Sequence, residues 1–328
     1  MTDERNGMDD LAIQWYPGHM AKAVRMMREN RKLVDLIIEM LDARVPASSR
    51  NPDIDALTEN KYRLILLNKA DLADPEITKR WIRYFKERGA EAAAIDARNK
   101  KLRTELPMKI KRLCREKTER DREKGIVARP LRAMVAGIPN VGKSTLINTL
   151  AGRASAKTGN RPGVTKGKQW ITLQKELELL DTPGLLWPKF EDTRTGRHLA
   201  VIGSVNGQIV DSEALCLTLL SELAERYPAL LQARYGVDAG DGGEGREIRS
   251  AYVDDSTEAS AEASADIDTC GGIGSRSHAE LLLARICESR KLLKKGGAPD
   301  TARGAAMLLD EFKSGKIGRI SLEDESFF

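Results

Sequence analysis

The sequence lacks paired cysteines. Its 328 residues include four cysteines that lie far apart, and none forms a C-x-x-C pair (Cys114, Cys216, Cys270 and Cys287). Isolated thiols of this kind are typical of a reducing compartment and argue against a disulfide framework. A zinc site made from Cys270, His278 and Cys287 would have poor ligand spacing, so we expect no structural zinc.

Long apolar runs and targeting signals are also missing. No stretch approaches the roughly 20 apolar residues that a membrane-spanning helix needs. Residues 1–10 are polar and acidic, unlike a signal peptide or an arginine-rich transit peptide. No lipidation motif is present. We therefore expect a soluble, cytoplasmic protein without membrane partners.

Charge is mild overall but uneven along the chain. The formal net charge is +5, and the hydrophobic fraction of 41% supports the cores of two domains. Residues 109–132 carry ten Lys or Arg against four acids, and residues 285–319 carry nine against four. These basic stretches indicate either solvated helix faces or a nucleic-acid surface. Residues 236–268 carry ten acids against two Arg, which is typical of a flexible insertion.

One motif organises the chain. Residues 137–145 read GIPNVGKST and fit G-x-x-x-x-G-K-[ST], between a strand pattern and a helical pattern. The backbone N–H groups of such a loop, with the positive end of the helix, bind polyphosphate. Lys143 would reach the β and γ phosphates, and the Ser144 hydroxyl would bind Mg²⁺. The expected nucleotide-binding residues here are Asn140, Val141, Gly142, Lys143, Ser144 and Thr145.

A second motif, N-K-A-D at residues 68–71, follows another strand pattern. The Asp71 carboxylate can accept hydrogen bonds from N1–H and the 2-amino group of guanine, a donor pair that adenine lacks. Asn68 can brace the O6 side of the base, and Lys69 can lie along its ring. These features favour GTP over ATP. The expected base-binding residues are Asn68, Lys69, Asp71, Asp96 and Ala97.

A third motif, D-T-P-G at residues 181–184, ends a further strand pattern. Asp181 would hold Mg²⁺ through a water, and the N–H of Gly184 would meet the γ-phosphate, so this segment can sense hydrolysis. Thr165 can add a hydroxyl to Mg²⁺. Leu185 stands where many GTPases place a water-orienting Gln, so intrinsic turnover should be slow and a partner or another group must assist.

The order of these motifs is rotated. In ordinary GTPases the phosphate loop comes first and N-K-x-D follows D-x-x-G, whereas here N-K-A-D precedes the loop. In this order the chain resembles the circularly permuted GTPases of the YlqF/YawG group. The stretches that carry the resemblance are WYPGHMAKA, DARVPASSRNP, NKAD, GIPNVGKSTLIN, RPGVTKGKQW and DTPGLLWPK. The resemblance is dense from residue 13 to about 210 and thins over the tail, where GKIGRISLE (315–323) still matches and the acidic insertion departs from the group's compact tail.

Strands that alternate with helices predict an α/β fold with a mostly parallel sheet covered on both faces. The resemblance implies that this is a circularly permuted P-loop GTPase domain, followed by a small all-α C-terminal domain. The expected divisions are a polar extension (1–12), the GTPase domain (13–205) and a helical domain (206–328) that binds RNA or the ribosome. Helical periodicity at 212–226, 278–295 and 301–313 agrees with the last of these.

Two residues are candidates to compensate for Leu185. The resemblance implies a K⁺ ion at Asn140, although an Asn at this position can also close the loop. It also implies a role in hydrolysis for His19, while a histidine that caps the following helix agrees equally well with the sequence. His198 and His278 have no partner pattern and are expected at the surface. The expected catalytic residues are His19, Lys143 and Thr165, and the expected metal ligands are Ser144, Thr165 and Asp181 for Mg²⁺ and Asn140 for K⁺.

The resemblance implies a GTPase that acts late in assembly of the large ribosomal subunit, with hydrolysis stimulated by that particle and coupled to release. The expected partners of a monomeric protein are GTP, GDP, and the rRNA and proteins of the subunit precursor, and the basic stretches agree with an RNA client. A switch with a non-ribosomal protein partner is an alternative. A metabolic nucleotide enzyme is a third, but no second substrate motif is present. Because D-T-P-G runs straight into the helical tail, hydrolysis could be transmitted to whatever the tail binds.

Overall fold

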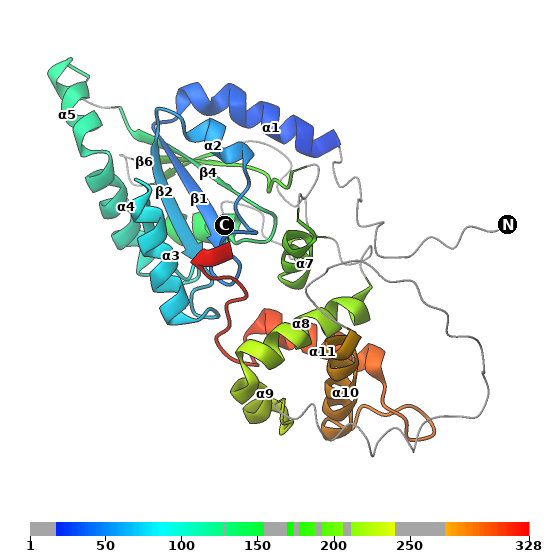
Figure 1. Cartoon of the computed structure of the whole chain (residues 1–328). Coiled ribbons are helices and arrows are strands. Elements are labelled where there is room, and N and C mark those ends of the chain that lie inside the picture. Colours follow the sequence, from blue (N-terminus) through cyan, green and yellow to red (C-terminus); the bar gives the residue numbers. More distant parts are fainter. Residues whose placement is uncertain are drawn as a thin grey trace. The chain divides into compact units, whose positions relative to one another are not determined.

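The chain forms two compact units in the computed structural model (Figure 1). The sheet unit contains residues 1–207 and 319–328, and the helical unit contains residues 208–318. The structure describes residues 18–126, 129–153, 169–173, 177–187, 192–205, 211–239 and 273–327. Among these residues, no helix is both long enough and apolar enough to cross a membrane.

A six-stranded sheet forms the centre of the sheet unit, in the order β3-β2-β1-β4-β6-β5. All neighbouring strands are parallel except β5, which pairs antiparallel with β6. The strands are β1 (Leu36–Asp42), β2 (Tyr62–Asn68), β3 (Glu91–Ala94), β4 (Leu131–Gly137), β5 (Gln169–Leu173) and β6 (Leu177–Asp181). Every residue of β1 is buried, including the two acids Glu39 and Asp42, as expected for a central strand of a sheet covered on both faces.

Helices cover both faces of this sheet. The helices of the sheet unit are α1 (Gly18–Asn30), α2 (Asp53–Thr58), α3 (Pro75–Glu87), α4 (Leu102–Leu113), α5 (Arg115–Glu123), α6 (Lys143–Ala151) and α7 (Thr193–Val201), with short 3₁₀ turns η2 (Arg31–Leu33) and η5 (Glu325–Phe327). α3 begins where Asp74 accepts hydrogen bonds from two N–H groups of its first turn and Pro75 fixes the backbone. α5 continues beyond α4 and has no buried residues (Figure 1).

One face of the sheet packs against the helices that precede and connect its first strands. Ile37 of β1 and Met134 of β4 are paired residues and share a cluster with Met27 of α1 and Ile54 of α2. A neighbouring cluster places Trp81 of α3 against β1, β2 and β3. Figure 1 shows α1 and α2 over this part of the sheet. α6 contacts β4, β5, β6 and α4, and these elements complete the α/β fold that the sequence predicts.

The helical unit contains α8 (Ser212–Arg226), α9 (Pro228–Tyr235), α10 (Ile273–Ser289) and α11 (Thr301–Ser314). α8 packs against both α10 and α11, and these two contact each other. α10 and α11 approach closely at Gly304, where a Cβ would lie 2.3 Å from Sγ of Cys287. Glu311 of α11 accepts hydrogen bonds from Arg234 and Tyr235 of α9. The all-α C-terminal domain expected from the sequence is therefore present.

Two sequence expectations differ from the structure. His198 was expected at the surface, but it is 1% exposed, because α7 presents it to a buried carboxylate, Glu323, whose Oε1 lies 2.7 Å from its Nδ1. The expected helical domain ran to residue 328, whereas residues 319–328 belong to the sheet unit. The polar extension and most of the acidic insertion lie outside the described residues.

Candidate nucleotide-binding site

The motifs predicted from the sequence meet at one edge of the sheet. β1, β2, β4 and β6 are parallel, so their carboxyl ends lie together. Asp42, at the end of β1, is opposite Asn68 at the end of β2. Gly137, at the end of β4, is opposite Met40 of β1, and Asp181 ends β6 on the other side of β4. The base-reading, phosphate-binding and D-T-P-G segments therefore leave neighbouring strands at the same edge.

The phosphate-binding loop connects β4 to α6. Gly142 has a φ of +106°, and a Cβ there would lie 2.3 Å from Nδ2 of Asn68, so the close passage of the loop requires glycine. α6 begins at Lys143 and thus places Ser144 and Thr145 in its first turn. The N–H groups of a first turn lack partners within the helix and favour an anion.

Lys143 is buried and lies across its own loop. Its Nζ donates to the carbonyl oxygens of Gly137 at 3.0 Å and Ile138 at 2.7 Å. Burial lowers the pKa of Lys143 to about 8, although the nearby Asp181 carboxylate acts in the opposite direction. A cation with this little solvation is stabilised when an anion such as polyphosphate approaches.

Asp181 has the environment of an Mg²⁺ ligand that acts through water. It is 1% exposed, and burial raises its pKa to about 6, against the effect of Lys143. Within the described part of the chain its buried Oδ1 has no hydrogen-bond partner. A buried carboxylate oxygen without a partner suits a hydrated cation, because it can accept from metal-bound water. Ser144 would bind the ion directly, and Thr165, the other expected ligand, lies outside the described residues.

The D-T-P-G segment touches the phosphate loop through its backbone. The N–H of Leu185 donates to the carbonyl of Gly137 at 3.2 Å. A Cβ on Gly184 would lie 2.6 Å from Cα of Pro139, so the two main chains are in direct contact. The Leu185 side chain is 1% exposed and packs in the core beside α1 and α2. The residue after D-T-P-G is thus a core residue that cannot orient a water.

Asn68 connects three motifs. Its Nδ2 donates to the carbonyl of Val141 in the phosphate loop at 2.6 Å, and its Oδ1 accepts from the N–H of Ala97 at 2.8 Å. Asn68 therefore fixes the phosphate loop and the 96–98 segment relative to N-K-A-D. Its contact with O6 of the base stays a prediction.

Lys69 is held by a buried ion pair between Asp42 and Arg44, which the sequence did not reveal. Nζ of Lys69, whose φ is +59°, donates to Oδ2 of Asp42 at 2.8 Å. The same carboxylate accepts from Nε and Nη2 of Arg44 at 2.8 and 2.7 Å. Burial alone would raise the pKa of Asp42, but Arg44 and Lys69 outweigh it and hold this pKa well below its usual range. The only sequence signal for this pair was the DARVPASSRNP stretch of the family resemblance.

The carboxylate of Asp71 faces Arg98. Nη2 of Arg98 lies 2.6 Å from Oδ2 of Asp71, and Nε lies 2.9 Å from Oδ1 of Asp96. A guanidinium presents adjacent N–H donors, as the N1–H and 2-amino edge of guanine does. Guanine would replace Arg98 as the donor to Asp71, whose side chain is 35% exposed, and this contact stays a prediction.

The segment after α7 fastens the phosphate loop. Asn140, whose φ is +58°, donates from Nδ2 to the carbonyl of Gly203 at 2.7 Å, and Ser204 donates from its hydroxyl to the carbonyl of Pro139 at 2.9 Å. Asn140 thus closes the loop, and its ligation of K⁺ stays a prediction. His19 lies in α1, but its side chain is outside the described residues and its role in hydrolysis also stays a prediction.

The fold and the site define a circularly permuted P-loop GTPase, because the phosphate-loop strand lies mid-chain yet occupies the centre of the sheet. A family model described as "50S ribosome-binding GTPase" matches residues 132–227. Ribosome biogenesis GTPase A of Priestia megaterium is 43% identical over 317 residues, which cover 96% of this chain and 98% of the relative. The chain belongs to the ribosome biogenesis GTPase A family.

Solved structures agree with this assignment. The structure titled "Crystal structure of GNP-bound YlqF from T. maritima" has a TM-score of 0.57 and 26% identity, and it covers 92% of this chain and 98% of its own. A GDP-bound YlqF structure has the same TM-score at 25% identity, with 92% and 99% coverage. The relatives span the sheet unit and the helical unit alike, so the likeness extends over both.

Proposed function

We propose that this GTPase acts late in maturation of the large ribosomal subunit, where the subunit precursor stimulates hydrolysis and hydrolysis is coupled to release. One observation carries the proposal: in chain order the D-T-P-G segment of the nucleotide site is followed by α7 and then by the helical unit. The names of the relatives and the description of the matching family model support a ribosomal client.

The site supplies a distinct task for each motif. Asp71 reads the guanine edge, and Lys143 together with the first turn of α6 holds the phosphates. Ser144, Thr165 and Asp181 would hold Mg²⁺, which neutralises charge on the β and γ phosphates when it is bound. The N–H of Gly184 would meet the γ-phosphate and lose this partner on hydrolysis.

Stimulation by a partner follows from Leu185. A core leucine at this position leaves the attacking water without a side chain to orient it, so intrinsic turnover is slow. His19 would supply the missing group once the ribosomal particle positions the start of α1, and Asn140 would hold a K⁺ ion that supplies positive charge near the phosphates. Both roles come from the family resemblance.

The client is recognised by the helical unit and by basic side chains of the sheet unit. α5 has no buried residues and its four basic side chains are balanced by four acidic ones, but residues 109–132 as a whole carry ten Lys or Arg against four acids, which suits a phosphate backbone. We propose a cytoplasmic monomer that meets rRNA and ribosomal proteins in this way. The alternative is a switch with a protein partner outside the ribosome.

Co-sedimentation distinguishes the ribosomal assembly role from a switch with a protein partner outside the ribosome. The chain bound to a non-hydrolysable GTP analogue should sediment with large-subunit precursors at low salt and be released by GDP. Absence of sedimentation at low salt would remove the assembly role while leaving the GTPase activity intact. Limited proteolysis adds a second test, since tail cleavage should differ between the GDP and the GTP-analogue states if the tail follows the switch.

A further inference from the structure

The last residues of the chain return to the guanine-reading edge of the sheet unit. After α11 ends at Ser314 and Gly315 turns with a φ of +75°, residues 319–327 run along the sheet unit. We call these residues the C-terminal strap. Ile320 and Leu322 are each 1% exposed, so the strap is embedded in this unit.

The strap binds the backbone of the loop that contains Asp71. Arg319 donates from Nη2 to the carbonyl of Ala70 at 2.8 Å and from Nε to the carbonyl of Ala73 at 2.9 Å. One guanidinium thus spans the loop on both sides of Asp71. In addition, the N–H of Ile320 donates to the carbonyl of Leu72 at 2.9 Å.

The strap also reaches the residues that hold Lys69. The N–H of Leu322 donates to the carbonyl of Arg44 at 2.8 Å, and Arg44 forms the buried pair with Asp42. Ser321 connects the loop after β2 to the segment after β1. Its hydroxyl accepts from the N–H of Asp74 at 3.1 Å and donates to the carbonyl of Ala43 at 3.4 Å.

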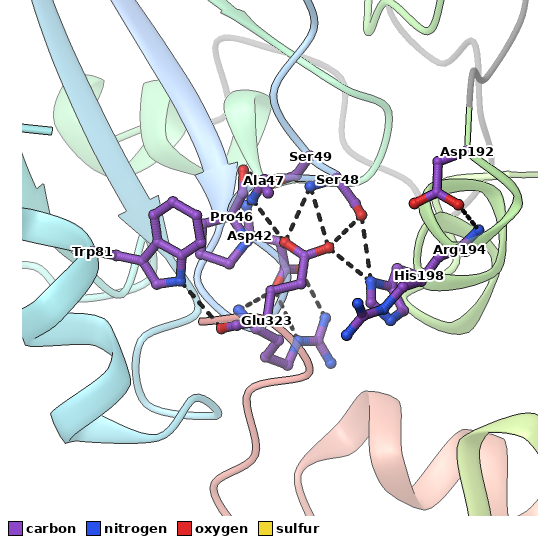
Figure 2. Close-up of polar contacts among 11 residues, drawn as sticks. Asp42, Pro46, Ala47, Ser48, Ser49, Trp81, Asp192, Arg194, His198 and Glu323 are labelled. Carbon is purple, nitrogen blue, oxygen red and sulfur yellow. Dashed lines mark hydrogen bonds and ion pairs between the residues drawn. The ribbon is translucent and has the colours of Figure 1, made fainter. Parts of the chain in front are cut away.

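Glu323 anchors the strap (Figure 2). Its Oε2 accepts from the N–H of Ala47 at 2.7 Å, and both carboxylate oxygens lie near the N–H of Ser48. Nδ1 of His198 is 2.7 Å from Oε1, and Nε1 of Trp81 donates to the Glu323 carbonyl at 3.1 Å. With 1% exposure and this many donors, Glu323 fixes the register of the strap against the unit.

The loop needs external support, because Lys69 adopts a left-handed backbone conformation that is rare for a non-glycine residue. Such a conformation persists only where the surroundings determine it. The strap occupies the carbonyls of three of the five residues from Ala70 to Asp74. We propose that the strap holds the guanine-reading loop in its binding conformation, and that Arg319 is a positioning residue for selection of GTP.

The proposal rests on the guanine-reading role of Asp71, and a comparison of GTP with ITP tests both. ITP lacks only the 2-amino group, so the ratio of the two dissociation constants reports that contact alone.

Arg319→Ala should weaken GTP binding about tenfold and ITP binding about threefold in titration calorimetry, because two charge-assisted hydrogen bonds are lost. Arg319→Lys should give an intermediate ratio, since an ammonium cannot span both carbonyls. Lys316→Ala, an exposed basic residue just before the strap, is the matched control and should leave both constants unchanged.

The outcomes separate cleanly. If wild-type protein binds GTP and ITP equally, Asp71 does not read the 2-amino group and the proposal falls with it. If wild type prefers GTP and Arg319→Ala lowers the melting temperature but keeps that preference, the strap is only structural and the proposal is overturned. Should Arg319→Ala fail to fold, the ratio measured for Arg319→Lys decides: a preference equal to wild type overturns the proposal, and a reduced one supports it.

Discussion

The buried pair of Asp42 and Arg44 makes a quantitative prediction about stability. The Asp42 carboxylate accepts hydrogen bonds from N–H, Nε and Nη2 of Arg44 at 3.1, 2.8 and 2.7 Å and from Nζ of Lys69 at 2.8 Å. Its side chain is fully buried and that of Arg44 is 1% exposed. Asp42→Asn keeps one acceptor oxygen but removes the buried negative charge that Arg44 and Lys69 both face. Breaking a buried pair in this way costs about 3–5 kcal/mol, and we expect about 3 kcal/mol here because one acceptor remains.

Urea unfolding monitored by tryptophan fluorescence measures this loss. All four tryptophans lie within residues 1–207, so their fluorescence reports on the sheet unit. The double variant Asp42→Asn/Arg44→Met is the control, because it removes both charges and should cost less than Asp42→Asn alone. A loss below about 1 kcal/mol for Asp42→Asn, or a double variant that is less stable than the single one, would refute the reasoning.

The Asp42–Arg44 pair also predicts how the free energy of unfolding depends on pH: its contribution is lost on acidification. The pKa of Asp42 is lowered on folding, so its contribution is fully present above the unfolded pKa of about 4 and is lost as pH falls toward the folded value. The difference in stability between wild type and Asp42→Asn should therefore be constant near neutral pH and shrink below about pH 4. A difference that grows on acidification would contradict the assigned direction.

Three further predictions concern other parts of the site. Gly184→Ala places a Cβ 2.6 Å from Cα of Pro139, so the switch must move and single-turnover GTP hydrolysis should fall about tenfold or more, whereas normal turnover would show that this contact is dispensable. Glu323→Gln turns an amide toward backbone donors and should destabilise the sheet unit by about 2 kcal/mol in urea unfolding; a stability equal to wild type would discount the anchor. His19→Ala should lower particle-stimulated turnover while GTP affinity stays near wild type, and unchanged turnover would remove His19 from the mechanism.

The sequence alone predicted the fold class and the motifs because both depend on local patterns. Apolar runs that end in polar motifs identify parallel strands and the edge where their carboxyl ends meet. Glycine positions could be assigned in the same way, since the pattern G-x-x-x-x-G-K-[ST] encodes a local backbone path. The rotated order of the motifs, which is also a property of the sequence, identified the permuted topology.

Contacts between distant segments were decided only by the tertiary structure. His198 is buried against the carboxylate of Glu323, which lies 125 residues later in the chain. Asp42 meets Lys69 because β1 and β2 pair in register, a fact that neither segment carries by itself. In the sequence, Arg319 is one of several basic residues of the tail. In the folded protein its guanidinium donates to the carbonyl of Ala70, in the N-K-A-D loop. Local patterns determine the elements of this protein, whereas the pairing of buried charges follows from packing, because desolvation allows a charge in the interior only where the fold supplies its partner.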